Sequence, residues 1–115
     1  MKNFIKFFIL VTMSNLLIQN SIAQQSTFEI RGHTSCGTWI KERRAKSWAS
    51  LASESWLVGY LSGIVVARHQ DFLKGTDNES IFLWMDRFCN ENLISDTSDG
   101  AQEIYLQLTK SKGLR

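Results

Sequence analysis

The sequence predicts an all-α fold, a small four-helix domain with one disulfide that follows an N-terminal signal peptide. Three observations support this prediction. Apolar residues recur at spacings of three and four, which is the pattern of helices that bury one face. The 115 residues include no proline, so no helix is interrupted by a missing backbone N–H. The chain has only two cysteines, and both lie after the predicted signal.

The first segment has the three parts of a secretory signal. Lys2 and Lys6 are followed by an apolar run over residues 4–18 and by the small residues around Ala23. The run contains polar residues and is shorter than the roughly 20 apolar residues of a spanning helix, which favours a cleaved signal over a permanent membrane anchor. We therefore expect a signal peptide over residues 1–23 and a periplasmic or secreted domain over residues 24–115.

Two helices are predicted in the first half of this domain. The first covers residues 37–44, with Trp39 and Ile40 apolar, and a weak break follows over residues 46–53. The long central helix covers residues 53–72 and ends at Gly75, because glycine readily adopts the left-handed conformation of a C-cap. Its apolar residues recur with helical spacing: Trp56, Leu57, Tyr60, Leu61 and Ile64.

Two more helices are predicted in the second half. Asp77 or Asn78 can cap the third helix by accepting hydrogen bonds from its free amides, and its inner face contains Ile81, Trp84, Met85, Phe88 and Cys89. A turn over residues 90–96 leads to the last helix, for which Ser98 or Thr97 is the predicted cap. The apolar stripe of this helix is Ala101, Ile104, Tyr105 and Leu108.

The two cysteines, Cys36 and Cys89, enter an oxidising compartment if the chain is exported, so we expect a structural disulfide between them. In the simple loop model, closing about 54 residues contributes roughly 4 kcal/mol. Zinc could also bind these cysteines together with His33 and His69, but structural zinc sites use two closely spaced pairs of ligands. We therefore expect no metal and no cofactor.

Charge and motifs exclude several classes of function. Without Lys2 and Lys6, the 13 Lys and Arg residues become 11 and equal the 11 Asp and Glu residues, so strong nucleic-acid binding is not expected. No nucleophile elbow, phosphate-binding loop or zinc-protease pair occurs in the sequence. We therefore expect no catalytic residues and no enzymatic activity, and consider a partner protein instead.

Two groups of residues are candidates for contacts. Trp39 and Trp48 flank a basic cluster that includes Arg43 and Arg44, and this composition is favoured at protein interfaces. The alternative is that these tryptophans only cover the core while cations extend over them. The central helix also contains Gly59, Tyr60 and Gly63, where paired glycines predict close helix packing, either against the chain's own helix or against a second subunit in a homodimer.

These features together resemble a known group of proteins. The segments 35–39 (SCGTW), 56–63 (WLVGYLSG) and 84–89 (WMDRFC), with the signal and the amphipathic last helix, resemble the small exported helical proteins of the Tai/Rap immunity group of type VI secretion. Members of that group carry a G-Y-x-x-G helix like residues 59–63. In size and single disulfide, the chain is also similar to the HdeA-type periplasmic acid chaperones.

Each resemblance implies a different role. The immunity group implies a non-enzymatic inhibitor that binds a toxic effector as a dimer. The chaperone group implies a fold that loosens in acid and exposes an apolar face to unfolded clients, which requires carboxylates whose protonation destabilises the native state. We favour a binding protein with a defined partner, because such chaperones are rich in lysine and modest in aromatic residues, whereas this chain has arginines and tryptophans.

Overall fold

The computed structural model describes residues 28–115, so the predicted signal peptide lies outside the described residues. Within them the chain forms four α-helices and no β-strand. They are α2 (Cys36–Ala45), α3 (Trp48–Arg68), α4 (Asn78–Glu91) and α5 (Thr97–Ser111). The predicted all-α, four-helix fold with one disulfide is confirmed.

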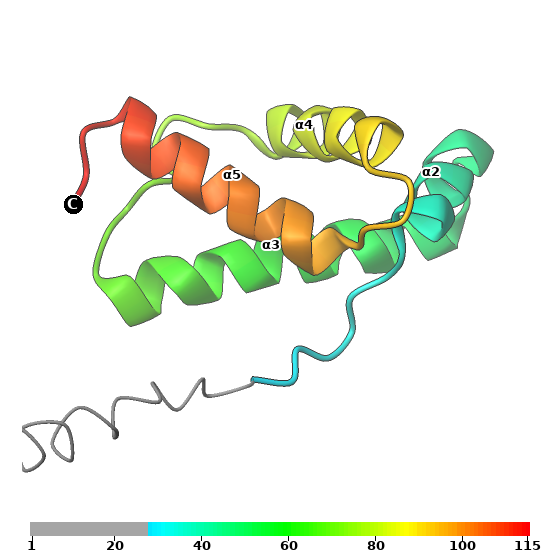
Figure 1. Ribbon diagram of the computed structural model, residues 1–115, viewed down its shortest axis with the longest axis horizontal. Coiled ribbons are helices and arrows are strands. Elements are labelled where there is room, and N and C mark those ends of the chain that lie inside the picture. The colour runs from blue at the N-terminus through cyan, green and yellow to red at the C-terminus, as the bar shows by residue number, and fades with distance from the viewer. Residues whose placement is uncertain (1–27) are drawn as a thin grey trace, which may run out of the picture.

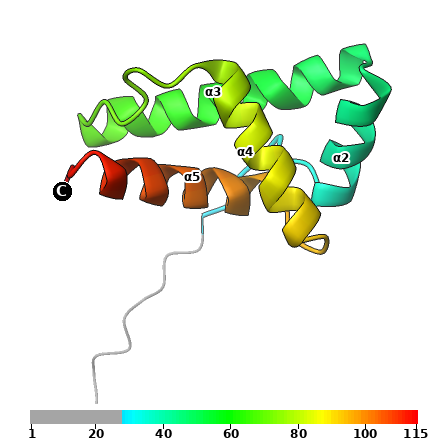
Figure 2. The ribbon, with the colours of Figure 1, turned by 90° about the horizontal axis from the view of Figure 1, so that it is seen from above.

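The four helices pack into a small bundle. α3 and α5 run alongside each other, α4 crosses both of them on one side, and α2 lies across one end (Figure 1, Figure 2). The C-terminus lies at the opposite end of the bundle from α2 (Figure 1). This arrangement places the short α2 against both α3 and α4, and the candidate site lies where these three helices meet.

The core is built from one face of each helix together with the loop after α3. Leu57 and Leu61 of α3 are fully buried, as is Phe72 of the following loop. The rings of Phe72 and Tyr105 form a T-shaped pair with their centres 5.1 Å apart. Further buried residues are Cys36, Trp39, Ile81, Phe82, Met85, Cys89, Ala101 and Ile104.

The cap of α4 is confirmed, and the cap of α5 is corrected. Asp77 accepts a hydrogen bond from the Ser80 amide at 2.8 Å, as predicted. The cap of α5 is Asp96, which accepts from the amides of Ser98 and Asp99, whereas we predicted Ser98 or Thr97. Thr97 instead is buried and bonds to the backbone of Thr34.

The central helix begins and ends earlier than predicted. The turn between α2 and α3 consists of Lys46 and Ser47 only, because Lys46 adopts the left-handed conformation with φ of 49°. At the other end, His69 adopts the same conformation with φ of 51° and ends α3, while Gly75 lies in the loop beyond. The weak break predicted over residues 46–53 is therefore limited to residues 46–47, and the predicted end of the helix at Gly75 was wrong.

The predicted disulfide is present and ties α2 to α4. Cys36 and Cys89 are bonded, with their Cα atoms 4.8 Å apart. Beside it, the Cys36 amide donates to the carbonyl of Ser95 and the Thr97 amide donates to the carbonyl of Thr34. The starts of α2 and α5 and the end of α4 are thereby joined at one corner of the domain.

The outward face of α3 has no charge for most of its length. Exposed residues recur on this face from Trp48 to Ala67, and none of them is charged. Among the described residues, α3 is also the one helix long and apolar enough to cross a bilayer by length and composition alone, a test that core helices of soluble proteins also meet. Here Leu57 and Leu61 pack into the core, and the opposite face is available for contact.

Candidate functional site

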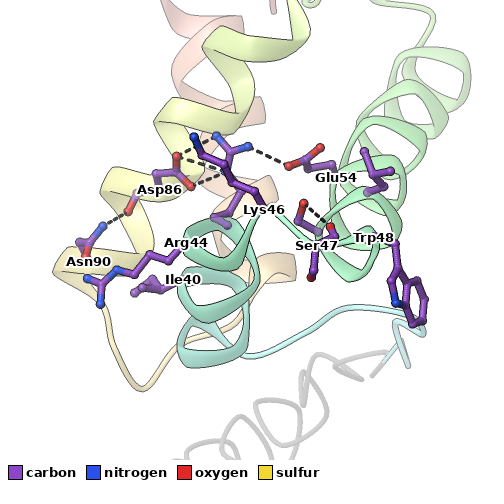
Figure 3. Close-up of a pocket in the computed structure, with 11 residues that line it drawn as sticks. Ile40, Arg44, Lys46, Ser47, Trp48, Glu54, Asp86 and Asn90 are labelled. Atoms are coloured by element: carbon purple, nitrogen blue, oxygen red, sulfur yellow. Dashed lines mark hydrogen bonds and ion pairs between the residues drawn. The ribbon is translucent and has the colours of Figure 1, made fainter.

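A cleft of about 680 Å³ lies where α2, the start of α3 and α4 meet (Figure 3). Arg43, Glu54 and Asp86 form its floor, one residue from each helix. The rim is formed by residues from the end of α2, the α2–α3 turn, the start of α3 and the end of α4: Ile40, Arg44, Lys46, Trp48, Leu51 and Asn90. Two of the four predicted partner-binding residues, Arg44 and Trp48, therefore lie on the rim of this cleft.

Arg43 links the three helices through charged hydrogen bonds. Its Nε lies 3.0 Å from Asp86 Oδ1, its Nη2 lies 3.0 Å from Asp86 Oδ2 and its Nη1 lies 2.8 Å from Glu54 Oε1. All three side chains are less than one third exposed, Glu54 at 12% being the least exposed. The hydrogen bond to Asp86 raises the pKa of Arg43; burial opposes this shift, and Glu54 adds to it. The floor is thus a fixed group of one cation and two carboxylates.

Trp39 lies beneath this floor, which corrects our prediction that it contacts a partner. Its side chain is fully buried, and its indole Nε1 donates a 2.8 Å hydrogen bond to Asp86 Oδ1. The Arg43 guanidinium lies 5.9 Å from the Trp39 ring centre and 5.6 Å from that of Phe82. A buried indole needs a partner for its N–H, and Asp86 supplies it. Trp39 therefore supports the site from within the domain.

The rim, in contrast, offers side chains that the rest of the domain does not use. Arg44 and Lys46 are exposed, and neither takes part in an ion pair among residues 28–115. Trp48 is 81% exposed and Leu51 is 62% exposed. Figure 3 shows Trp48 extending from the start of α3, while Arg44 lies on the α2 side of the cleft. The rim thus combines two exposed cations with two large apolar side chains.

Sequence reasoning missed Leu51 and assigned Arg43 to the surface. Leu51 fell inside the predicted break after residue 46, so it was given no helical face. Arg43 and Arg44 are adjacent in a basic cluster, and composition alone does not distinguish them. The helical period does carry a signal, because Arg43 lies four residues after buried Trp39 on the same face of α2.

The predicted packing of the central helix against another helix of the chain is corrected. Gly59 and Gly63 are exposed, and a β-carbon at either position would meet nothing within 4 Å. Tyr60 is partly buried and stacks on Trp56 with ring centres 5.1 Å apart. The glycine that allows helices to approach is Gly100 of α5, where a β-carbon would lie 2.5 Å from Met85 Sδ. Contact of α3 with a second subunit stays a prediction.

The cysteines leave no thiolate for metal binding. Cys36 and Cys89 are bonded to each other, so the alternative set of zinc ligands with His33 and His69 lacks its two sulfur ligands. Within the described part of the chain, no three His, Cys, Asp or Glu side chains are grouped as a metal site would require.

No family model, curated protein or solved structure matches this chain. The resemblance to the Tai/Rap immunity group and to HdeA-type chaperones stays a prediction made from the short motifs of the sequence.

Proposed function

We propose that this protein is an exported, non-enzymatic binding protein that acts through the cleft between α2, α3 and α4, as an immunity-type inhibitor of a toxic effector. The observation that supports this proposal most is that exposed Trp48 and Leu51 line the same cleft as Arg44 and Lys46, two cations that form no ion pair among residues 28–115. Tryptophan and arginine are the residues that contribute most to protein interfaces.

The floor of the cleft supports the same proposal. Arg43 is bonded to both Glu54 and Asp86, so the backbone of three helices is held in place before any partner arrives. A preorganised surface loses less conformational freedom on binding. The ionised groups of the floor bond to one another rather than extend into the open cleft, which favours recognition over catalysis.

Site-specific photo-crosslinking in a periplasmic extract of the native host tests this proposal. A photoreactive residue at Leu51 is expected to give one dominant protein adduct, and the same residue at Leu106, an exposed position on α5, is expected to give none. The adduct is expected to disappear in the double variant Arg44→Glu, Lys46→Glu and to persist in Lys110→Glu.

The captured protein is then purified and its affinity for the intact chain is measured, together with the inhibition of its toxic activity. Equal crosslinking from Leu51 and Leu106 would contradict the assignment of the surface. If the specific partner shows no toxicity, the proposal of a binding protein would stand but the proposal of an immunity role would be contradicted.

A specific observation also favours the chaperone alternative. Asp77 and Asp96 each cap a helix, and the pKa of both carboxyl groups is lowered. Hydrogen bonds from Ser80 cause the shift of Asp77. For Asp96, partial burial opposes the shift, but hydrogen bonds from Ser98 and Asp99 and the nearby His33 outweigh it. Acid would therefore weaken the first turns of α4 and α5, and suppression of client aggregation only below about pH 4 would support this alternative.

A further inference from the structure

We infer that the binding surface is an elongated groove along α3 that takes an acidic segment of the partner. In this arrangement, carboxylates of the segment meet Arg44 and Lys46, an aliphatic side chain meets Leu51, and its backbone passes close over Gly59. The inference rests on the proposed function and extends it, because it names the chemistry of the partner and adds a second half to the surface.

The cleft at the end of α2 is adjacent to a second hollow along α3. A second hollow of about 380 Å³ lies between α3 and the start of α4, and it is lined by Leu51, Val58, Gly59, Asn78 and Phe82, among others. Leu51 and Glu54 line both this hollow and the cleft at the end of α2. From Ser47 to Gly59 the helix axis extends by roughly 18 Å at 1.5 Å per residue. An extended segment of about five residues covers that distance.

The distribution of charge along the groove favours one kind of bound segment and one orientation of it. Arg43 forms ion pairs with Asp86 and Glu54, so the cations available to a ligand are Arg44 and Lys46 at one end of the groove. Beyond Glu54, whose side chain is only 12% exposed and faces Arg43, the exposed residues of α3 are uncharged as far as Ala67. A segment with carboxylates at one end and apolar side chains at the other therefore matches the groove.

Gly59 explains how the second half can accept a backbone. A glycine inside a helix is unfavourable relative to alanine, and within this domain no neighbour requires it, since a β-carbon there would meet nothing within 4 Å. The absence of a side chain lowers the wall of the groove at this point. A partner backbone can then lie nearer to α3 at Gly59 than it could beside a residue with a side chain.

The inference is tested with a phage-displayed library of random peptides about twice the length of the groove, selected against the whole domain with its disulfide intact. We expect enriched peptides in which Asp or Glu precedes or follows an aliphatic residue within a few positions. Their affinity is expected to fall at least about tenfold in Arg44→Glu, Lys46→Glu and also in Gly59→Leu, which fills the open space. Lys110→Glu is the control for charge and is expected to bind normally.

Circular dichroism checks the fold of each variant, and Gly59→Ala serves as the matched control that keeps the helix while adding only a methyl group. Enriched peptides without acidic residues, or no enrichment at all, would overturn the inference. Binding to phosphatidylglycerol vesicles in place of peptides would also overturn it and assign the rim to a membrane surface. If peptide affinity falls in Arg44→Glu, Lys46→Glu but not in Gly59→Leu, the elongated groove would be overturned while the proposed function would stand. The crosslinking experiment tests that function separately.

Discussion

Arg43 and Asp86 face each other as a two-pronged pair, with Nε 3.0 Å from Oδ1 and Nη2 3.0 Å from Oδ2. Arg44, the next residue along α2, is exposed and takes part in no ion pair among the described residues. Two adjacent arginines therefore have different roles, since Arg43 holds helices together and Arg44 remains available to a partner.

Substitution of the two arginines is expected to change the stability of the fold by different amounts. Arg43→Ala leaves Asp86 and Glu54 partly buried without their cation, so the free energy of unfolding should fall by about 1–3 kcal/mol. Arg44→Ala removes an exposed side chain and should change it by less than about 0.5 kcal/mol. Urea unfolding followed by circular dichroism measures both values, and an equal loss in the two variants would contradict the assigned roles.

Reduction of the Cys36–Cys89 disulfide is expected to lower the free energy of unfolding by about 2–4 kcal/mol. The bond joins residues 53 positions apart, and its loss releases loop entropy in the unfolded chain. Urea unfolding with and without reductant measures the effect. The double variant Cys36→Ala, Cys89→Ala is the control and should not respond to reductant, so an identical response in both proteins would refute this account.

Alanine at three glycines should have opposite effects on stability. Gly59→Ala and Gly63→Ala add a methyl group in open space on α3 and should each raise the free energy of unfolding by up to about 1 kcal/mol. Gly100→Ala forces a β-carbon to within 2.8 Å of Phe88 Cδ1 and nearer still to Met85, which should lower it by about 1–3 kcal/mol. Thermal unfolding of the three variants tests this, and unchanged stability of Gly100→Ala would show that the side chains of Met85 and Phe88 can shift at no cost.

Acid should destabilise the domain through the cap of α5. The pKa of Asp96 is lower in the folded chain than its ordinary value of 3.8. Its contribution to stability is therefore complete above that value and is lost as the pH falls through the folded-state pKa. Asp96→Asn keeps a capping side chain without the titrating group. Its urea midpoint should vary less between about pH 5 and pH 2 than that of the natural chain, while Asp71→Asn, at an exposed loop residue, should behave like the natural chain.

Periodicity was enough to predict the four helices, and the presence of only two cysteines in an expected exported chain was enough to predict the disulfide. The cap of α4 is Asp77. The start of this helix was predictable to within one residue, because Asp77 and Asn78 both precede an apolar stripe and either side chain can accept hydrogen bonds from free amides. The cap of α5 was not, because Asp96, Thr97 and Ser98 are all good caps, and the choice depends on the contact of Thr97 with Thr34. This contact joins residues 63 positions apart and leaves no local signal.

The candidate site was predictable only in part. Trp48 and the basic cluster indicated a contact surface, but the burial of Trp39 depends on Asp86 of α4, which local spacing does not reveal. The end of α3 at His69 was also missed, since a left-handed conformation at histidine is less common than at glycine. Gly59 and Gly63 were recognised as unusual, yet their open surroundings became visible only in the folded domain.

The corner that joins Thr34 to Thr97 has a consequence for how the chain matures. A chain that emerges from its N-terminus presents Cys36 long before Cys89, and the backbone partners of Cys36 and Thr34 arrive later still, at residues 95 and 97. Contacts of such large separation form slowly compared with local helices. During synthesis, α2 therefore cannot complete its contacts until nearly the whole polypeptide has emerged, and the Cys36 thiol stays unpaired until Cys89 is available.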